Sequence, residues 1–188
     1  MSYINKTLTF ESDKIYFTDE DNISQSEVMM DWEHDLMSGS AAYVTENGGD
    51  ILEIGFGMGI SAGYIQSHSI SSHTIVESHP QIIAKAQSWA ADKPNVSIVT
   101  GSWYDNLDIL STYDGVFYDT YGDEHSPYFS SSLTQLVKSG AKVTFWNTLP
   151  TSESIFQFDN IQYQEFNITS SENSYFNSSK YFLPKKQF

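Results

Sequence analysis

The sequence contains no cysteine and no arginine, and each absence excludes a class of chemistry. Without cysteine the chain has no disulfide, no thiolate nucleophile and no cysteine-ligated metal. Without arginine it lacks the planar group that binds carboxylates and phosphates through two parallel hydrogen bonds. All nine basic residues are lysines, against 24 acidic residues, and the formal net charge is -15. This balance argues against nucleic acid as a partner and favours a cationic or neutral ligand.

The sequence also lacks a long apolar run, and no apolar signal-like segment follows Met1. We therefore expect a soluble, cytoplasmic protein that does not interact with membranes. The 188 residues are 39% hydrophobic and 15% aromatic, which is typical of a globular chain. The length suits one domain over 1–188, as a monomer or homodimer. Within it we expect an N-terminal hairpin or lid (1–24), an N-terminal helix (25–48) and a Rossmann-like core (50–188).

The N-terminal region predicts a hairpin followed by a helix. Residues 7–18 read as two short strands around an acidic turn. Ser24-x-x-Glu27 matches a capping box and predicts a helix that runs to about residue 47. On that helix Met29, Glu33 and Met37 would share one face, because they are four residues apart. A methionine stripe alone is more often core, but a carboxylate within it either faces solvent or is buried for a partner.

From residue 50 onward strand and helix patterns alternate, which predicts a doubly wound α/β sheet. The expected strands cover 50–54, 73–77, 95–99, 114–119 and 141–147, and the expected helices 59–67, 80–91 and 127–138. Residues 161–168 and 175–183 then alternate like an antiparallel pair. We expect a mostly parallel sheet with a C-terminal antiparallel hairpin and helices on both faces. That hairpin distinguishes a methyltransferase-type sheet from a dinucleotide dehydrogenase sheet.

The first of these strands runs into a glycine loop, Gly55-Phe56-Gly57-Met58-Gly59. Its glycines permit backbone angles and close approaches that a Cβ would block, although an ordinary strand-to-helix turn also explains the pattern. Glu77 ends the second strand 22 positions after Gly55, where an acidic residue is placed to bind ribose hydroxyls. Together they favour a nucleoside site at the carboxyl ends of the strands, where Asp119 also lies. Trp103 follows the third strand and either covers an adenine or belongs to the core.

Three separated segments carry a more specific resemblance: Val28-Met29-Met30-Asp31-Trp32-Glu33, Leu52-Glu53-Ile54-Gly55-Phe56-Gly57-Met58 and Phe117-Tyr118-Asp119-Thr120-Tyr121. In this order they resemble the guanidinoacetate N-methyltransferases and the related fungal arginine N-methyltransferases that methylate the δ-nitrogen. Counterparts also exist for Gly101-Ser102-Trp103, Asn147 and the segment 180–184. The similarity covers residues 26–150 well and the tail more thinly.

The resemblance implies a class I fold that uses S-adenosylmethionine to methylate a guanidino or amino nitrogen of a small molecule or a protein. The product would be S-adenosylhomocysteine, and no metal is needed. The cofactor would contact Met29, Met37, Gly55, Phe56, Gly57, Glu77, Ser102, Trp103, Tyr118 and Asp119. The substrate would contact Glu33, Asp119, Tyr121, Trp146 and Asn147. Glu33 and Asp119 match the family's two carboxylates that grip the guanidino group, and Asp119 would take its proton.

Two departures from the family pattern keep other hypotheses open. The relatives that bind guanidinoacetate hold its carboxylate with an arginine near the N-terminus, and this chain has none. The segment before the terminal hairpin is also shortened. A cofactor-binding or interaction module that retains the fold without its substrate is therefore the alternative. A nicotinamide-dependent dehydrogenase is a third hypothesis, against which the loop spacing and the terminal hairpin both count.

Overall fold

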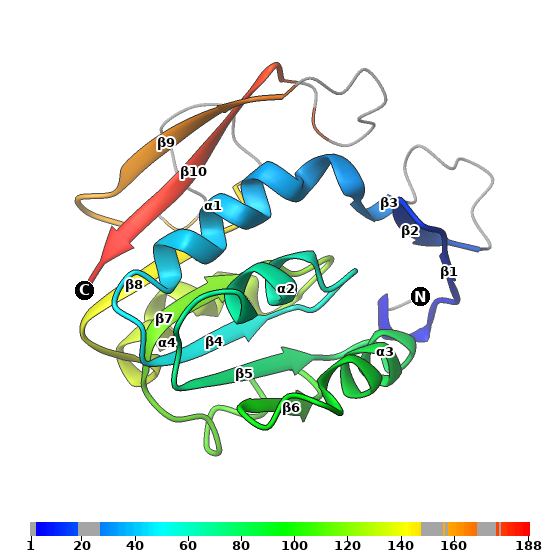
Figure 1. Cartoon of the computed structure of the whole chain (residues 1–188), viewed down its shortest axis with the longest axis horizontal. Helices are drawn as coiled ribbons and strands as arrows, with labels where there is room; N and C mark the ends of the chain where they lie inside the picture. Colours follow the sequence, from blue (N-terminus) through cyan, green and yellow to red (C-terminus); the bar gives the residue numbers. More distant parts are fainter. Residues whose placement is uncertain (1–2, 19–26, 148–155, 157, 169–175, 177) are drawn as a thin grey trace.

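A computed structural model of the chain describes residues 3–18, 27–147, 156, 158–168, 176 and 178–188 (Figure 1). Its strands are β1 (Leu8–Phe10), β2 (Lys14–Phe17), β3 (Glu27–Met30), β4 (Asp50–Ile54), β5 (Ser72–Glu77), β6 (Val96–Thr100), β7 (Tyr113–Tyr118), β8 (Val137–Phe145), β9 (Gln162–Asn167) and β10 (Lys180–Gln187). The α-helices are α1 (His34–Val44), α2 (Ile60–Gln66), α3 (Pro80–Ala90) and α4 (Phe129–Leu136). The short 3-10 helices are η1 (Tyr3–Asn5), η3 (Asp31–Glu33) and η4 (Ser126–Tyr128).

A seven-stranded sheet in the order β6-β5-β4-β7-β8-β10-β9 forms the centre of the molecule. The strands β6, β5, β4, β7 and β8 pair in parallel, whereas β10 pairs antiparallel with both β8 and β9. The prediction of a mostly parallel sheet with a C-terminal antiparallel hairpin is therefore confirmed. Because β4 is central, its carboxyl end is flanked by those of β5 and β7, which places their following loops at one edge of the sheet.

Helices cover both faces of this sheet, as predicted (Figure 1). The alternation of side chains along each strand decides which face a residue supplies. Ile51 and Phe117 pack in one cluster with α1, whereas Leu52 and Val116 pack with α4 on the other face. The helix α3 packs beside α2 through Ile82. The core is thus formed by apolar clusters on both faces of the sheet.

The predicted helix over 25–48 is wrong in its N-terminal part. Glu27–Met30 form β3, which pairs antiparallel with β2 and completes a small sheet in the order β1-β2-β3. Only after η3 does the chain enter α1, at His34. Met29, Glu33 and Met37 therefore lie on a strand, a 3-10 turn and a helix, and do not share a helical face. Ser24, the proposed cap, lies outside the described residues.

Elsewhere the predicted boundaries shift by a few residues. The last helix ends at Leu136, and β8 begins at Val137 instead of 141. The strand expected over 175–183 is β10, which begins at Lys180 because it pairs with β9 and then continues alongside β8. The segment after Trp103 is a series of turns. Residues 151–154 and 170–173, which belong to loops, lie outside the described residues. No helix in the described ranges is long and apolar enough to cross a membrane.

Candidate active site

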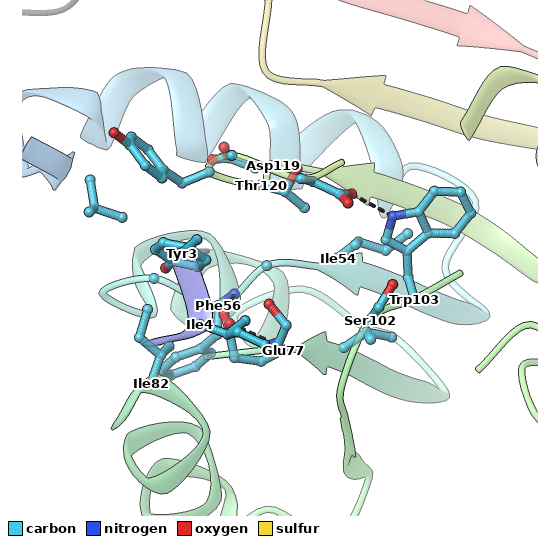
Figure 2. A pocket seen from close by; sticks show the side chains of 18 of the residues that line it. Tyr3, Ile4, Ile54, Phe56, Glu77, Ile82, Ser102, Trp103, Asp119 and Thr120 are labelled. Carbon is cyan, nitrogen blue, oxygen red and sulfur yellow. Dashed lines mark hydrogen bonds between the residues drawn. The ribbon is translucent and has the colours of Figure 1, made fainter. Parts of the chain in front are cut away.

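A cavity of about 710 Å³ lies at the carboxyl ends of the parallel strands, and the glycine loop forms part of its wall. This volume is typical of sites for small ligands. Figure 2 shows Asp119 and Thr120 on one side of the cavity, Phe56 and Glu77 on the other, and Ser102 with Trp103 at one end. The small N-terminal sheet and η1 contribute Tyr3, Phe17 and Met29 to the lining. The cavity is therefore built between the main sheet and the N-terminal region.

The glycine loop needs its glycines because other groups approach it closely. Gly55 has a φ of +96°, and a Cβ there would collide with the carbonyl oxygen of Asp119. A Cβ at Gly57 would lie 2.5 Å from the Met29 sulfur. That sulfur also accepts a hydrogen bond from the Met58 N–H at 3.1 Å. The loop backbone is thereby held between the end of β7 and β3, and it presents main chain to the cavity.

Glu77 is buried at the end of β5 and is fixed by three backbone N–H groups. Its Oε2 accepts from Phe56 at 2.9 Å, and its Oε1 accepts from Ser78 and His79, both at 2.8 Å. An ionised carboxylate has about four acceptor positions, so three are occupied and one is left. Because Glu77 also lines the cavity, that position suits one hydroxyl, such as a ribose hydroxyl of a nucleoside.

Trp103 belongs to the core and also borders the cavity, and its contact with an adenine stays a prediction. Its side chain is 2% exposed, and its indole N–H donates to Asp123 Oδ2 at 2.6 Å. The Tyr118 hydroxyl donates to the same oxygen at 2.7 Å, and the His125 N–H donates to Oδ1 at 2.8 Å. Burial, with Asp123 nearby, raises the pKa of Tyr118. Asp123 thus holds Trp103, Tyr118 and His125 in place at this end of the cavity.

Two carboxylates from distant parts of the chain, Glu33 and Asp119, also line the cavity. Glu33, in η3, is 1% exposed, and its Oε1 accepts from the Met30 N–H at 3.4 Å. Asp119 follows β7, and its N–H donates to the Ile54 carbonyl at 2.9 Å. Burial and then the nearby carboxylates of Glu33 and Glu53 raise the pKa of Asp119 well above its usual range. Like charges held this close are relieved by a bound cation.

Comparison with known proteins then decides the family. A family model described as guanidinoacetate N-methyltransferase matches residues 11–147. The chain belongs to the guanidinoacetate N-methyltransferase family. It is 36% identical over 163 residues to protein arginine N-methyltransferase 2 of Aspergillus fumigatus, covering 81% of this chain and 37% of the relative. The protein of the same name from Aspergillus oryzae is 34% identical, with 81% and 38% covered.

The chain thus spans under two fifths of the length of these two relatives. A solved structure from Streptococcus mutans, described as a SAM-dependent methyltransferase, superposes with a TM-score of 0.63. That match covers 96% of this chain and 55% of the other at 11% identity, so it shows the fold alone. The guanidinoacetate N-methyltransferase family member described here therefore has a class I methyltransferase fold.

Most residues that the sequence proposed for the site of this family member line the cavity. They are Met29, Glu33, Gly55, Phe56, Gly57, Glu77, Ser102, Trp103, Asp119, Tyr121 and Trp146. Their contacts with a cofactor or substrate stay predictions. Within the described ranges, no group of three or more histidine, aspartate or glutamate side chains is arranged to hold a metal ion.

Three proposed site residues lie outside the cavity lining. Met37 is on α1 and packs in the core, because the strand β3 breaks the helical face that was expected to carry it. Tyr118 points to the α4 face of the sheet and stacks on Phe129, with ring centroids 4.1 Å apart. Asn147 is buried, and its N–H donates to the Tyr181 hydroxyl at 2.8 Å. These three residues pack or form hydrogen bonds in the core instead of bordering the cavity.

Other lining residues were missed by the sequence reasoning. Tyr3 lies in η1, and its ring packs against His79 at 5.0 Å and Tyr121 at 5.4 Å between centroids. No local pattern indicates that the first residues fold back over β5 and β7. Ser61, in the first turn of α2, also lines the cavity, and its position directly after the glycine loop was a usable signal.

Proposed function

We propose that this chain is an S-adenosylmethionine-dependent N-methyltransferase that acts on a guanidino nitrogen. The observation that carries the proposal is that Glu33 and Asp119 line the same cavity as the glycine loop. A pair of carboxylates binds a guanidinium through charge-assisted hydrogen bonds. The neighbouring loop, with Glu77 and Trp103, suits the nucleoside of the cofactor. One cavity thus offers places for both reactants.

The cofactor's fit rests on three features of the described residues. The glycines let the main chain approach a ligand closely, since any Cβ at Gly55 is blocked by Asp119. Glu77 retains one acceptor position for a ribose hydroxyl. Ser102 and Trp103 border the end where an adenine would lie. When bound, S-adenosylmethionine supplies an electrophilic methyl group: a nitrogen–carbon bond forms, the carbon–sulfur bond breaks, and its electron pair stays on sulfur in S-adenosylhomocysteine.

The chain's own contribution is to orient the acceptor and remove its proton. A guanidinium keeps its proton far above neutral pH and is not nucleophilic while protonated. Glu33 holds the group through its charge, and Asp119 accepts the proton from the nitrogen that attacks. Because burial and Glu33 raise the pKa of Asp119, this carboxylate is a stronger base than an exposed one. Alignment of nitrogen and methyl group supplies much of the remaining acceleration.

The charges around the cavity define the acceptor class further. Lys6 is the one cationic side chain among the described lining residues, and its Nζ lies over the Phe17 ring, 4.1 Å from the centroid. An acceptor with a carboxylate beside its guanidino group, such as guanidinoacetate, would meet Glu33 and Asp119 without an arginine to balance it. Alkylguanidines and arginine side chains within a peptide fit this charge pattern better.

The proposal is tested with the purified chain, a panel of acceptors and S-adenosylmethionine labelled in its methyl group. The panel holds agmatine, an arginine-containing peptide, free arginine and guanidinoacetate. We expect calorimetric binding of S-adenosylhomocysteine, and label transfer to agmatine or the peptide in preference to guanidinoacetate. Binding of the cofactor without transfer to any acceptor would instead favour the non-catalytic module. Tight binding of NAD with no binding of S-adenosylhomocysteine would point to a dehydrogenase.

Binding of a guanidine is expected to release a proton, and its affinity is expected to rise with pH. In the free chain Glu33, Glu53 and burial raise the pKa of Asp119, so this carboxyl keeps its proton above the usual range for aspartate. A permanently charged guanidinium favours the ionised form. Calorimetry of agmatine in two buffers with different ionisation enthalpies measures the released proton directly.

The same shift has a defined sign for stability. A carboxyl whose pKa is higher in the folded than in the unfolded state makes the folded chain bind more protons between these two values. The free energy of unfolding contributed by Asp119 is therefore largest below the unfolded pKa and falls as the pH rises through the folded pKa. Bound agmatine should reduce this loss. An affinity for agmatine that does not change with pH would contradict the assignment, and Asp119→Asn serves as the control that releases no proton.

A further inference from the structure

A buried carboxylate and a buried imidazole on adjacent strands are in contact, and the chemistry above does not use this contact. Glu53 on β4 and His73 on β5 are both fully buried, and their Oε2 and Nε2 atoms are 3.0 Å apart. Glu53 pairs in register with Ile75, and His73 with Ile51, so both side chains lie on the face covered by α1 and α2. Burying two such polar groups costs free energy, so their contact is weak evidence for a purely stabilising role.

The pair connects to the cavity through one side chain. Ser61, in the first turn of α2, lines the cavity, is 2% exposed and donates its hydroxyl hydrogen to Glu53 Oε1. On the far side, the Gln66 amide nitrogen lies 3.3 Å from His73 Nδ1. The side chains of Gln66 and Glu53 thus lie against the two ring nitrogens of His73. Gln66, His73, Glu53 and Ser61 thus form a series of side-chain contacts that ends at the cavity.

This order determines what Ser61 can bind. A hydroxyl has one hydrogen and two lone pairs, and the hydrogen of Ser61 is already committed to Glu53. Towards the cavity it therefore offers only lone pairs, and the negative charge behind it strengthens them as acceptors. An anionic group such as a carboxylate is excluded, whereas a cationic N–H donor is favoured. The charge of Glu53 acts on Asp119, so the Ser61 hydroxyl lies near the part of the cavity where methyl transfer would occur.

We propose that Ser61, held by Glu53 and His73, accepts a hydrogen bond from a cationic N–H group in this cavity. The donor we favour is the α-ammonium of the cofactor's amino-acid part, and the guanidinium of the methyl acceptor is the other source of the same chemistry. Glu53 and His73 act through Ser61 and are positioning residues. The inference rests on the proposed function, because it takes both reactants from it.

Ser61→Ala tests the inference by calorimetry with three ligands. S-adenosylhomocysteine carries the α-ammonium, 5′-methylthioadenosine keeps the nucleoside and sulfur but lacks the amino-acid part, and agmatine carries the guanidinium. We expect Ser61→Ala to weaken S-adenosylhomocysteine binding about tenfold or more, the size of a hydrogen bond to a charged group. Binding of 5′-methylthioadenosine should change less than about threefold, since a neutral nucleoside makes no such bond.

Two further variants separate the role of the hydroxyl from packing. Ser61→Thr keeps a hydroxyl and should recover most of the affinity for S-adenosylhomocysteine. Ser132→Ala removes a similarly buried hydroxyl, 5% exposed, from α4 outside the cavity lining and should leave all three affinities unchanged. Melting curves of each variant show whether the fold is intact.

The outcomes discriminate between the inference and the function on which it rests. A loss confined to agmatine supports Ser61 as a cation acceptor and assigns it to the guanidinium. Equal losses for S-adenosylhomocysteine and 5′-methylthioadenosine, or no loss for any ligand, would overturn the inference alone. If the unmodified chain binds none of the three ligands, the proposed function fails, and the inference fails with it.

Discussion

Changing Asp119 to asparagine is expected to lower the rate of methyl transfer by about 10³-fold, the usual scale for losing a general base. The affinity for S-adenosylhomocysteine should stay within about threefold, because asparagine has the same shape and keeps the backbone N–H that donates to Ile54. We expect the fold of this variant to stay intact. Burial, Glu33 and Glu53 raise the pKa of this carboxyl, so replacing it by a neutral amide removes repulsion in the free chain. The melting temperature at neutral pH should be equal or higher.

The measurement is single-turnover label transfer to the best acceptor of the panel, together with calorimetry of S-adenosylhomocysteine. Asp108→Asn is the matched control: it removes the same charge from an exposed position that does not line the cavity, and it should leave the rate unchanged. Full activity of Asp119→Asn would remove the proposed proton acceptor. A loss of cofactor binding equal to the loss of rate would instead make Asp119 a cofactor ligand rather than a base.

The parts of the fold that were predicted correctly are those with strong local signals. The strand β4, the glycine loop and α2 are predicted within one residue, because an apolar run, three glycines and a helical pattern follow each other without interruption. The small sheet β1-β2-β3 was missed in part for the opposite reason. The segment 27–30 has helical spacing and a capping pattern, but pairing with β2 overrides both. Such pairing depends on a partner strand, which local sequence patterns do not identify.

The candidate site divides in the same way. Gly55, Glu77 and Asp119 were placed correctly at the cavity because each ends a strand, and the ends of parallel strands meet. Tyr118 lies outside the cavity lining because neighbouring residues of a strand point to opposite faces, and resemblance to a family does not specify which face borders the cavity. The pair of Glu53 and His73 could not be foreseen, since it depends on the register between two strands.

Gly55→Ala is expected to have the largest effect on cofactor binding of any methyl-sized change in the loop. The residue has a φ of +96°, which strains any residue with a Cβ, and that Cβ would collide with the Asp119 carbonyl oxygen. Relief requires either the loop or the end of β7 to move, and both border the cavity. We expect the affinity for S-adenosylhomocysteine to fall by more than about 100-fold, and the free energy of unfolding by about 1–3 kcal/mol.

Gly63→Ala provides a control of opposite sign. Gly63 lies in α2, is exposed, and has no atom within 4 Å of an added Cβ. Alanine favours a helix over glycine by about 1 kcal/mol, so this variant should melt higher and bind S-adenosylhomocysteine with unchanged affinity. Denaturant unfolding and calorimetry are measured on both variants. The comparison separates the general effect of an added methyl group from the specific effect of adding it at Gly55. If Gly55→Ala binds the cofactor as tightly as Gly63→Ala, the loop does not approach the ligand, and the nucleoside must be held by Glu77 and the opposite wall alone.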